Sequence, residues 1–340
     1  MIAVDEAFLP GVGIHKIPTP VPFMEAGGPA NAYALEDVGG GFSLFDCGCG
    51  TDEGLAALRE GLASRGLEVK HLNRVIVSHG HVDHYGNAQT LAEESGCEVF
   101  VHPHDLEKIV GEGRWYRQLE KSWGYFLRLG VPEATLNAML DGAKRSRPYA
   151  RPVDRARVKT LAGGDALQFK YFDAKVLHLP GHTPGLVCLH VEKRKLLFAD
   201  DHVLAKVSPN PLLDLSLGET DDTKFKALVS YYRSARAVKA MELECLLPGH
   251  GEAFKGHVEL LEGLFQFYEL RQNRIMKRLG SEPATVYELV SAVFPRVDIG
   301  RMYLMLSEVM GNVEVLEERG ELERFEEGGR LKLRAARRRV

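Results

Sequence analysis

Short apolar runs alternate with segments of helical spacing along most of the chain. Leu55, Leu58 and Leu62 recur at steps of three and four and predict a helix over residues 54–66. The apolar run over residues 75–77 is continuous and short, which is typical of a buried strand. Strands and helices in alternation predict an α/β fold. Strands are expected at residues 31–36, 42–45, 73–78, 98–101, 166–172, 175–179, 186–191, 195–198 and 245–247, and further helices at 86–95, 219–241 and 257–279.

The pattern changes after about residue 281. Thr285 and Glu288 have the spacing of a capping box and predict a helix that runs to Phe294. A second helical stretch covers about residues 300–320, and residues 321–333 read as a hairpin with a turn at 326–329. We therefore expect a small domain at residues 281–340, joined by the helix 257–279 to a larger domain at residues 1–262.

The composition is that of an ordinary globular protein. The chain has 340 residues, 45% of them hydrophobic and 26% charged, and a formal net charge of −4, which gives no overall attraction to nucleic acid or to a membrane. Residues 1–23 show no basic segment followed by an apolar core, and no apolar run has transmembrane length. The five cysteines are odd in number and scattered, which suits a reducing compartment. We expect a cytoplasmic protein without a membrane partner.

The densest candidate chemistry lies directly after the strand 73–78. His79, His81, Asp83 and His84 place three imidazoles and one carboxylate within six residues. In a tight loop these spacings can aim side chains at two adjacent points, and both ligand types suit zinc, iron or manganese. The alternative is an exposed polar loop, in which each neighbouring histidine would need its own hydrogen-bond partner or exposure to water. The pattern favours a metal site.

The order His-x-His-x-Asp-His after an apolar strand resembles the signature of the metallo-β-lactamase superfamily. The resemblance implies three further ligands, and the chain supplies His182 in LPGHTPG, Asp201 in ADDH and His250 in PGHG. It covers about residues 20–255. It implies an α/β fold of the αββα type, with two β-sheets between outer helices and the metal loops along one edge.

The resemblance also implies a role for each residue. One metal would be held by His79, His81 and His182, and the other by Asp83, His84 and His250, with Asp201 bridging the pair. Two divalent ions could share a water and lower its pKa, so that a bridging hydroxide attacks a carbonyl or phosphorus centre. Asp83 would take or relay a proton, and Asp46 would support the centre from behind. Zinc is expected first, and iron and manganese are alternatives because histidine and aspartate suit all three.

One position departs from the family pattern. Asp200 stands where the family usually has glycine before the bridging aspartate. Its side chain would point away from the metals or toward groups behind the ligands. If the backbone there needs a positive φ, aspartate tolerates it better than most residues.

Residues 111–157 are the least family-like part and are interpreted as a helical insertion. Trp115, Leu119, Trp123 and Phe126 recur at helical spacing, and a second helical stretch covers residues 132–144. This aromatic stripe either packs onto the domain or forms an apolar lid over the metal site. Residues 144–159 then carry seven basic residues and one acid, which is either a solvated loop or a cationic rim that attracts an anionic substrate.

Two smaller clusters are interpreted as structural. His102 and His104 are expected to be surface or substrate-rim histidines, because seven ligands are assigned elsewhere. Cys47 and Cys49 could form a thiolate site, but two thiols without a further cysteine nearby more often pack.

The helices and hairpin of residues 281–340 resemble the small winged-helix domain appended to some superfamily members. Winged helices often bind nucleic acid, but between Glu308 and Glu327 eight acids stand against only Arg319 and Arg324. A phosphate-binding face needs the opposite sign. We interpret the domain as a packing or dimerisation module that edges the cleft, so a homodimer is a candidate assembly and nucleic acid is not an expected partner.

The identity of the bridging residue narrows the reaction. An antibiotic-opening zinc β-lactamase usually carries cysteine there and is exported, whereas an aspartate resembles the hydroxyacylglutathione hydrolase, lactonase, ribonuclease and flavodiiron branches. We expect a metal-dependent hydrolase of a small anionic thioester or ester, such as an acyl-glutathione or acyl-CoA. The alternative is a metal-dependent ribonuclease that acts on single-stranded RNA. A non-catalytic metal-dependent scaffold is disfavoured, because no ligand is missing.

Overall fold

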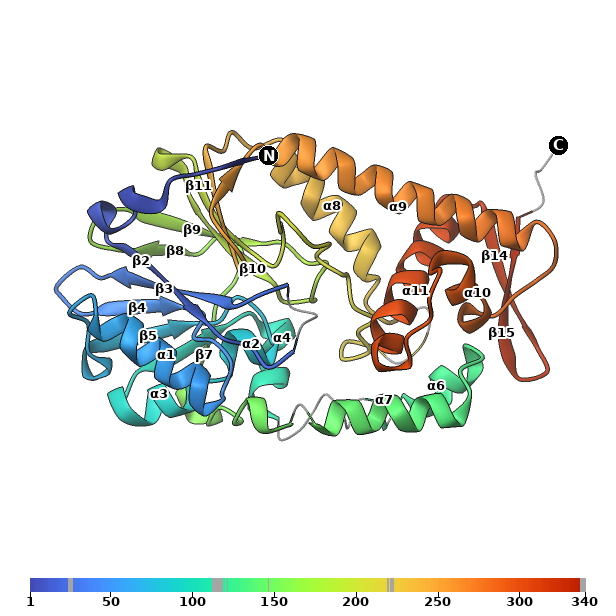
Figure 1. Cartoon of the computed structure of the whole chain (residues 1–340), viewed down its shortest axis with the longest axis horizontal. Helices are drawn as coiled ribbons and strands as arrows, with labels where there is room; N and C mark the ends of the chain where they lie inside the picture. The colour runs from blue at the N-terminus through green and yellow to red at the C-terminus, as the bar shows by residue number, and fades with distance from the viewer. Residues whose placement is uncertain are drawn as a thin grey trace.

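The computed structural model describes residues 1–23, 27–111, 119–120, 122–145, 147–218, 220 and 223–336. Two β-sheets stack face to face with helices on both outer faces, and a further group of helices with a hairpin lies to one side of them (Figure 1). This is the αββα sandwich expected from the sequence. No helix in the described part of the chain has the length and apolar character needed to span a bilayer.

The first sheet has the strand order β2-β3-β4-β5-β6-β7. β4 to β7 run parallel, so β4 and β5 end at the same edge, and β5 stops there just before the histidine loop. Both faces of β3 are buried, with Tyr33 and Leu35 toward the other sheet and Ala32 and Ala34 toward the helices, which explains its continuous apolar run. The strands are β2 (Ile14–Thr19), β3 (Ala30–Glu36), β4 (Phe42–Phe45), β5 (Leu72–Ile76), β6 (Glu98–Val101) and β7 (Val158–Thr160).

The second sheet has the order β1-β13-β12-β11-β10-β9-β8. β11 and β12 are parallel, so the residues that follow them meet at one edge. The single strand expected at 166–172 is shorter, because Phe169 N donates to Phe172 O and turns the chain. The strands are β1 (Ile2–Ala3), β8 (Ala166–Gln168), β9 (Asp173–His178), β10 (Val187–Val191), β11 (Leu196–Asp200), β12 (Cys245–Pro248) and β13 (Phe254–Lys255).

Helices cover the outer face of each sheet. The first sheet packs against α1 (Asp52–Ala63), α2 (Val82–Tyr85), α3 (Ala88–Ser95) and α4 (Pro103–Val110), and the second against α8 (Ala227–Lys239) and α9 (His257–Leu279). Short 3-10 turns lie at residues 6–8, 10–12, 69–71, 147–149, 155–157, 192–194 and 299–301.

The helix expected from residue 219 begins only at Ala227. The described residues just before Ala227 make two contacts with other parts of the chain. Phe225 forms an isolated antiparallel bridge with Asp214, and Lys224 makes a fully buried ion pair with Glu314. The bridge at Phe225 is incompatible with a helix through that residue, and helical periodicity alone does not predict it. Residues 219, 221 and 222 of the expected helix lie outside the described residues.

The insertion and the C-terminal elements form one core. α6 (Trp123–Arg128) and α7 (Glu133–Arg145) contribute Phe126 and Leu136 to the same apolar cluster as Leu289 of α10 (Val286–Val293) and Val309 of α11 (Met302–Glu318). Figure 1 shows α9 along one side and α6 and α7 along the other, both reaching from the sheets to this group. The described part of the aromatic stripe therefore packs onto the C-terminal helices and is not a lid, whereas Trp115 lies outside the described residues.

The C-terminal elements have the types expected from the sequence. Thr285 and Glu288 form the predicted capping box, with Thr285 N donating to Glu288 Oε2 at 2.7 Å. α11 is followed by the hairpin of β14 (Leu322–Glu327) and β15 (Arg330–Ala335). Tyr303 of α11 donates to the carbonyl of Leu213, and Glu314 of α11 pairs with Lys224. The C-terminal module, which comprises α10, α11, β14 and β15, therefore holds the chain before α8 at Leu213 and at Lys224.

Candidate metal centre

The loop after β5 is shaped by a carboxylate that was expected to stand behind the metals. Asp46 has a positive φ of 59° and directs its Oδ1 to the backbone N of Ser78 at 2.7 Å and its Oδ2 to the hydroxyl of Ser78 at 2.7 Å. The chain then turns into the short helix α2, which carries Asp83 and His84. This local fold lets four residues close in sequence face two neighbouring points.

Three histidines converge at the first point. The Nδ1 atom of His81 lies 2.9 Å from the Nε2 atom of His79 and 2.9 Å from the Nε2 atom of His182. His182 arrives from the turn after β9, and its Nδ1 donates to the carbonyl of Asn210 at 3.1 Å. A carbonyl only accepts, so Nδ1 carries the proton and Nε2 presents a lone pair to the cluster.

Asp83, His84 and His250 converge at the second point. Asp83 Oδ2 lies 3.4 Å from His250 Nε2 and 3.7 Å from His84 Nε2. The loop of His250 is fixed from the first sheet, because Asn31 Nδ2 and Tyr33 OH both donate to the carbonyl of Pro248, at 2.9 and 2.7 Å. Sequence reasoning missed these two residues, since nothing in a strand pattern marks a contact to a loop more than 200 positions away.

Asp201 lies between the two clusters. Its Oδ2 is 3.4 Å from His182 Nε2 and 3.6 Å from His84 Nε2, and its Oδ1 is 3.6 Å from His250 Nε2. The structure therefore brings all seven sequence-predicted ligands to one site: His79, His81, Asp83, His84, His182, Asp201 and His250.

Asp200 faces the opposite side of the same rings. Its Oδ2 lies 3.0 Å from His79 Nδ1 and its Oδ1 lies 3.3 Å from His84 Nδ1, while Asp46 Oδ2 lies 2.9 Å from the same His84 atom. Asp200 has a φ of 46°, which lies in the left-handed region that glycine, the family's usual residue here, adopts without strain. The two adjacent aspartates therefore contact different sides of the histidine rings: Asp201 faces Nε2 atoms and Asp200 faces Nδ1 atoms.

The donor set fits divalent cations. His84 Nε2 and Asp201 Oδ1 are buried and have no hydrogen-bond partner among the described residues, although both point into the cluster. Burial, followed by the nearby His79 and His182, holds the pKa of His81 well below its usual range, so its lone pair is free. Burial would also lower the pKa of His250, but Asp201 and Asp83 raise it to about 9, which marks a place that favours positive charge. Neutral imidazoles beside anionic carboxylates are the ligands that zinc and similar ions need.

A second histidine cluster has a different geometry. His102, His104 and His178 lie close together, but the rings of His102 and His178 stack at 3.9 Å between centroids and 16° between planes. Ring lone pairs lie in the plane of each ring, so stacked rings do not converge on one ion. His178 Nε2 also donates to the carbonyl of Pro184 at 2.8 Å. We interpret this cluster as packing.

Other candidate features lie apart from the metal centre. In the basic stretch, Arg151 binds Glu93 through both terminal nitrogens at 2.7 and 2.8 Å, and Lys159 lies 3.4 Å from Glu98. These pairs link the basic stretch to α3 and β6. Cys47 and Cys49 are buried, and burial raises the pKa of the Cys49 thiol to about 12, so neither joins a metal cluster among the described residues.

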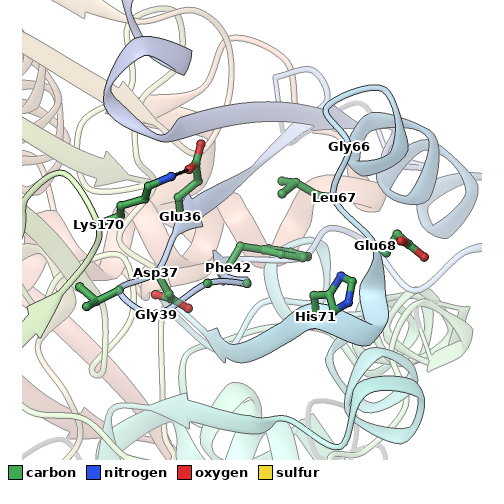
Figure 2. A pocket seen from close by; sticks show the side chains of 12 residues that line it. Glu36, Asp37, Gly39, Phe42, Gly66, Leu67, Glu68, His71 and Lys170 are labelled. Carbon is green, nitrogen blue, oxygen red and sulfur yellow. Dashed lines mark hydrogen bonds and ion pairs between the residues drawn. The ribbon is translucent and has the colours of Figure 1, made fainter.

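One surface hollow is also remote from the metal centre. It has a volume of about 500 Å³ and lies where β3 ends and β4 begins, at the opposite edge of the sheet. Figure 2 shows Lys170 paired with Glu36 on one side of it and His71 on the other. No group of metal-ligating side chains lines it among the described residues.

The sequence profile of the metallo-β-lactamase superfamily matches residues 26–250. The chain belongs to this superfamily, and its fold and site are those of a metal-dependent hydrolase. The probable metallo-hydrolase YqjP of Bacillus subtilis (strain 168) is 29% identical over 320 residues, which cover 93% of this chain and 95% of YqjP. The crystal structure of the metallo-β-lactamase family protein TTHA1429 from Thermus thermophilus superposes with a TM-score of 0.78 at 27% identity, covering 95% of this chain and 98% of the other.

A relative named for its substrate matches a shorter region. The acyl-coenzyme A thioesterase MBLAC2 of Gallus gallus is 26% identical over 203 residues, which cover 59% of this chain and 62% of the relative.

Proposed function

We propose that the chain is a dinuclear metal-dependent hydrolase that cleaves a small anionic thioester or ester. The observation that carries the proposal is the position of Asp201, whose two oxygens face Nε2 atoms of histidines from both clusters. A carboxylate in that position can bridge two cations. The thioester class is supported by the similarity to a named acyl-coenzyme A thioesterase.

When bound, two divalent cations supply a nucleophile from water at neutral pH and polarise the bond under attack. The chain's own residues do the rest. The ring nitrogens and Asp201 fix the reacting centre, and the contacts of Asn210, Asp46 and Asp200 with the Nδ1 atoms orient the rings. Asp83 Oδ2 is the candidate proton acceptor, because it faces the cluster and the side chain keeps 8% of its surface exposed.

Fewer features of the chain argue for an anionic substrate than the sequence indicated. Arg151 and Lys159 of the basic stretch each pair with a carboxylate, so these two residues do not by themselves argue for an anionic substrate. The anionic substrate class is supported by the similarity to the named acyl-coenzyme A thioesterase. Between Glu308 and Glu327 eight acids stand against two arginines, and this charge disfavours RNA as the substrate.

Metal analysis beside turnover assays tests the proposal. Purified protein is assayed with an acyl-CoA and acyl-glutathione panel and with single-stranded RNA, beside Asp201→Ala and the control Asp37→Ala, which removes a buried aspartate at the opposite edge. We expect about two metals per chain and thioester cleavage that Asp201→Ala abolishes and Asp37→Ala retains. RNA cleavage with inert thioesters would replace the substrate class, and less than one metal per chain would overturn the dinuclear centre.

A further inference from the structure

Asp105 is a buried carboxylate outside both ligand clusters. It lies in the first turn of α4 and is 0% exposed. Burial alone would raise the pKa of Asp105, but Lys108 and the surrounding hydrogen bonds lower it to about 2, so the group is charged at neutral pH.

Four donors converge on this carboxylate. Oδ2 accepts from the backbone N of Gly80 at 2.9 Å and from Oγ1 of Thr183 at 2.6 Å. Oδ1 accepts from the backbone N of Gly185 at 3.2 Å and from Nζ of Lys108 at 2.8 Å. An ionised carboxylate offers about four lone-pair sites, so the hydrogen-bonding capacity of Asp105 is filled.

Three of the four donors, Gly80, Thr183 and Gly185, come from the two loops that carry the three-histidine cluster. Gly80 stands between His79 and His81, and Thr183 follows His182. The loops lie about 100 positions apart in the chain, and the same Asp105 oxygen binds both of them. A helix holds that oxygen, which is a firmer support than a loop.

We propose that Asp105 is a positioning residue that sets the spacing between the loop of His81 and the turn of His182, and so the affinity of the metal held by His79, His81 and His182. The inference rests on the dinuclear centre of the proposed function. Lys108 connects Asp105 to Asp214, because its Nζ also lies 2.6 Å from Oδ2 of Asp214. Asp214 directly follows Leu213, which the C-terminal module contacts.

The isosteric substitution Asp105→Asn is the sharpest perturbation. The side-chain amide keeps the shape but turns an NH₂ group toward two of the four donors. In either orientation the turn of His182 loses one of its two contacts, from Gly185 or from Thr183, and in one orientation the loop of His81 loses its contact through Gly80 as well. The second cluster has no contact with Asp105, since His84 is held by Asp46 and His250 by the carbonyls of Gly28 and Pro29.

The experiment measures Zn²⁺ affinities of the full-length protein by competition with a chelator. For Asp105→Asn we expect one binding step to weaken by about 10- to 100-fold and the other to stay unchanged, since that is the usual effect of removing a group behind a metal ligand. His81→Ala, which removes a candidate ligand, identifies the step that belongs to the three-histidine cluster. The binding step that Asp105→Asn weakens must be the step that His81→Ala weakens.

Asp37→Asn is the matched control. Asp37 is also buried, and accepts from Ser43 Oγ and Asn73 Nδ2 at 2.8 Å and pairs with Arg74 at 3.4 Å. It lies at the hollow of Figure 2, at the sheet edge opposite the metal centre. We expect Asp37→Asn to lower stability while leaving both zinc affinities unchanged.

Thr183→Val keeps the test decisive if Asp105→Asn does not fold. It removes one donor to Asp105 and should weaken the same binding step to a smaller extent. Unchanged affinities, or equal weakening of both steps in either variant, would overturn the positioning role. Fewer than two zinc ions on the unmodified protein would instead overturn the proposed function, so the two failures are distinguishable.

Discussion

Asp200 offers a test in which backbone strain and metal support give opposite results. The residue has a left-handed backbone with a φ of 46°, and its carboxylate contacts Nδ1 of His79 at 3.0 Å and of His84 at 3.3 Å. Glycine at this position would relieve about 1 kcal/mol of backbone strain. It would also remove an orienting carboxylate shared by a histidine of each cluster.

Relief of backbone strain changes the stability of the fold, whereas loss of the carboxylate changes the affinity for metal. Losing a group behind a ligand weakens metal binding by about 10- to 100-fold, which corresponds to about 1.4 to 2.7 kcal/mol. Asp200→Gly and Asp200→Asn should therefore both weaken zinc binding by that factor, although only glycine relieves the backbone. Competition with a chelator measures both variants. If Asp200→Gly bound zinc as tightly as the unmodified chain, the orienting role would be refuted and the carboxylate would be a tolerated replacement for glycine.

Three other predictions follow from buried contacts. Glu314→Gln should destabilise the protein by about 3 to 5 kcal/mol in urea unfolding because it removes one charge of the buried ion pair between Lys224 and Glu314, and Lys224→Met combined with Glu314→Leu should recover part of the loss. Gly249→Ala should lose metal without unfolding, as metal analysis and circular dichroism would show, because a Cβ there meets the carboxylate of Asp201. The folded pKa of Asp105 of about 2 lies below its ordinary 3.8, so its charge stabilises the fold above about pH 4, and this stability is lost as pH falls through 2. The stability difference from Asp105→Asn should therefore shrink by about 2 kcal/mol between about pH 5 and pH 2, and a difference independent of pH would contradict this assignment.

The sequence predicted the sandwich and the meeting of the seven candidate ligands because both signals are local. The ligands lie in short segments that come after β5, β9, β11 and β12, and the parallel pairs β4–β5 and β11–β12 bring the ends of their strands to one edge. The capping box of Thr285 and Glu288 is equally local, and the structure contains it. The positive φ of Asp200 was also foreseeable, because the position normally holds glycine.

What the sequence left open depends on partners far along the chain. Helical spacing showed that Phe126 belongs to an apolar face, but not that this face shares a core with Leu289. The basic stretch was ambiguous because Glu93, which pairs with Arg151, lies on another element. Asp105 carried no motif of its own, since three of its four donors are far from it in sequence and become neighbours only after folding.

The core that the insertion shares with the C-terminal helices has a consequence for synthesis of the chain. Phe126 emerges from the ribosome before Leu289, a member of the same core about 160 residues later, and at about 5 to 20 residues per second the delay is roughly 8 to 30 s. During that interval the apolar face of α6 and α7 lacks its native cover. The two sheets can form from residues already made, but the insertion cannot reach its final packing until translation is nearly complete.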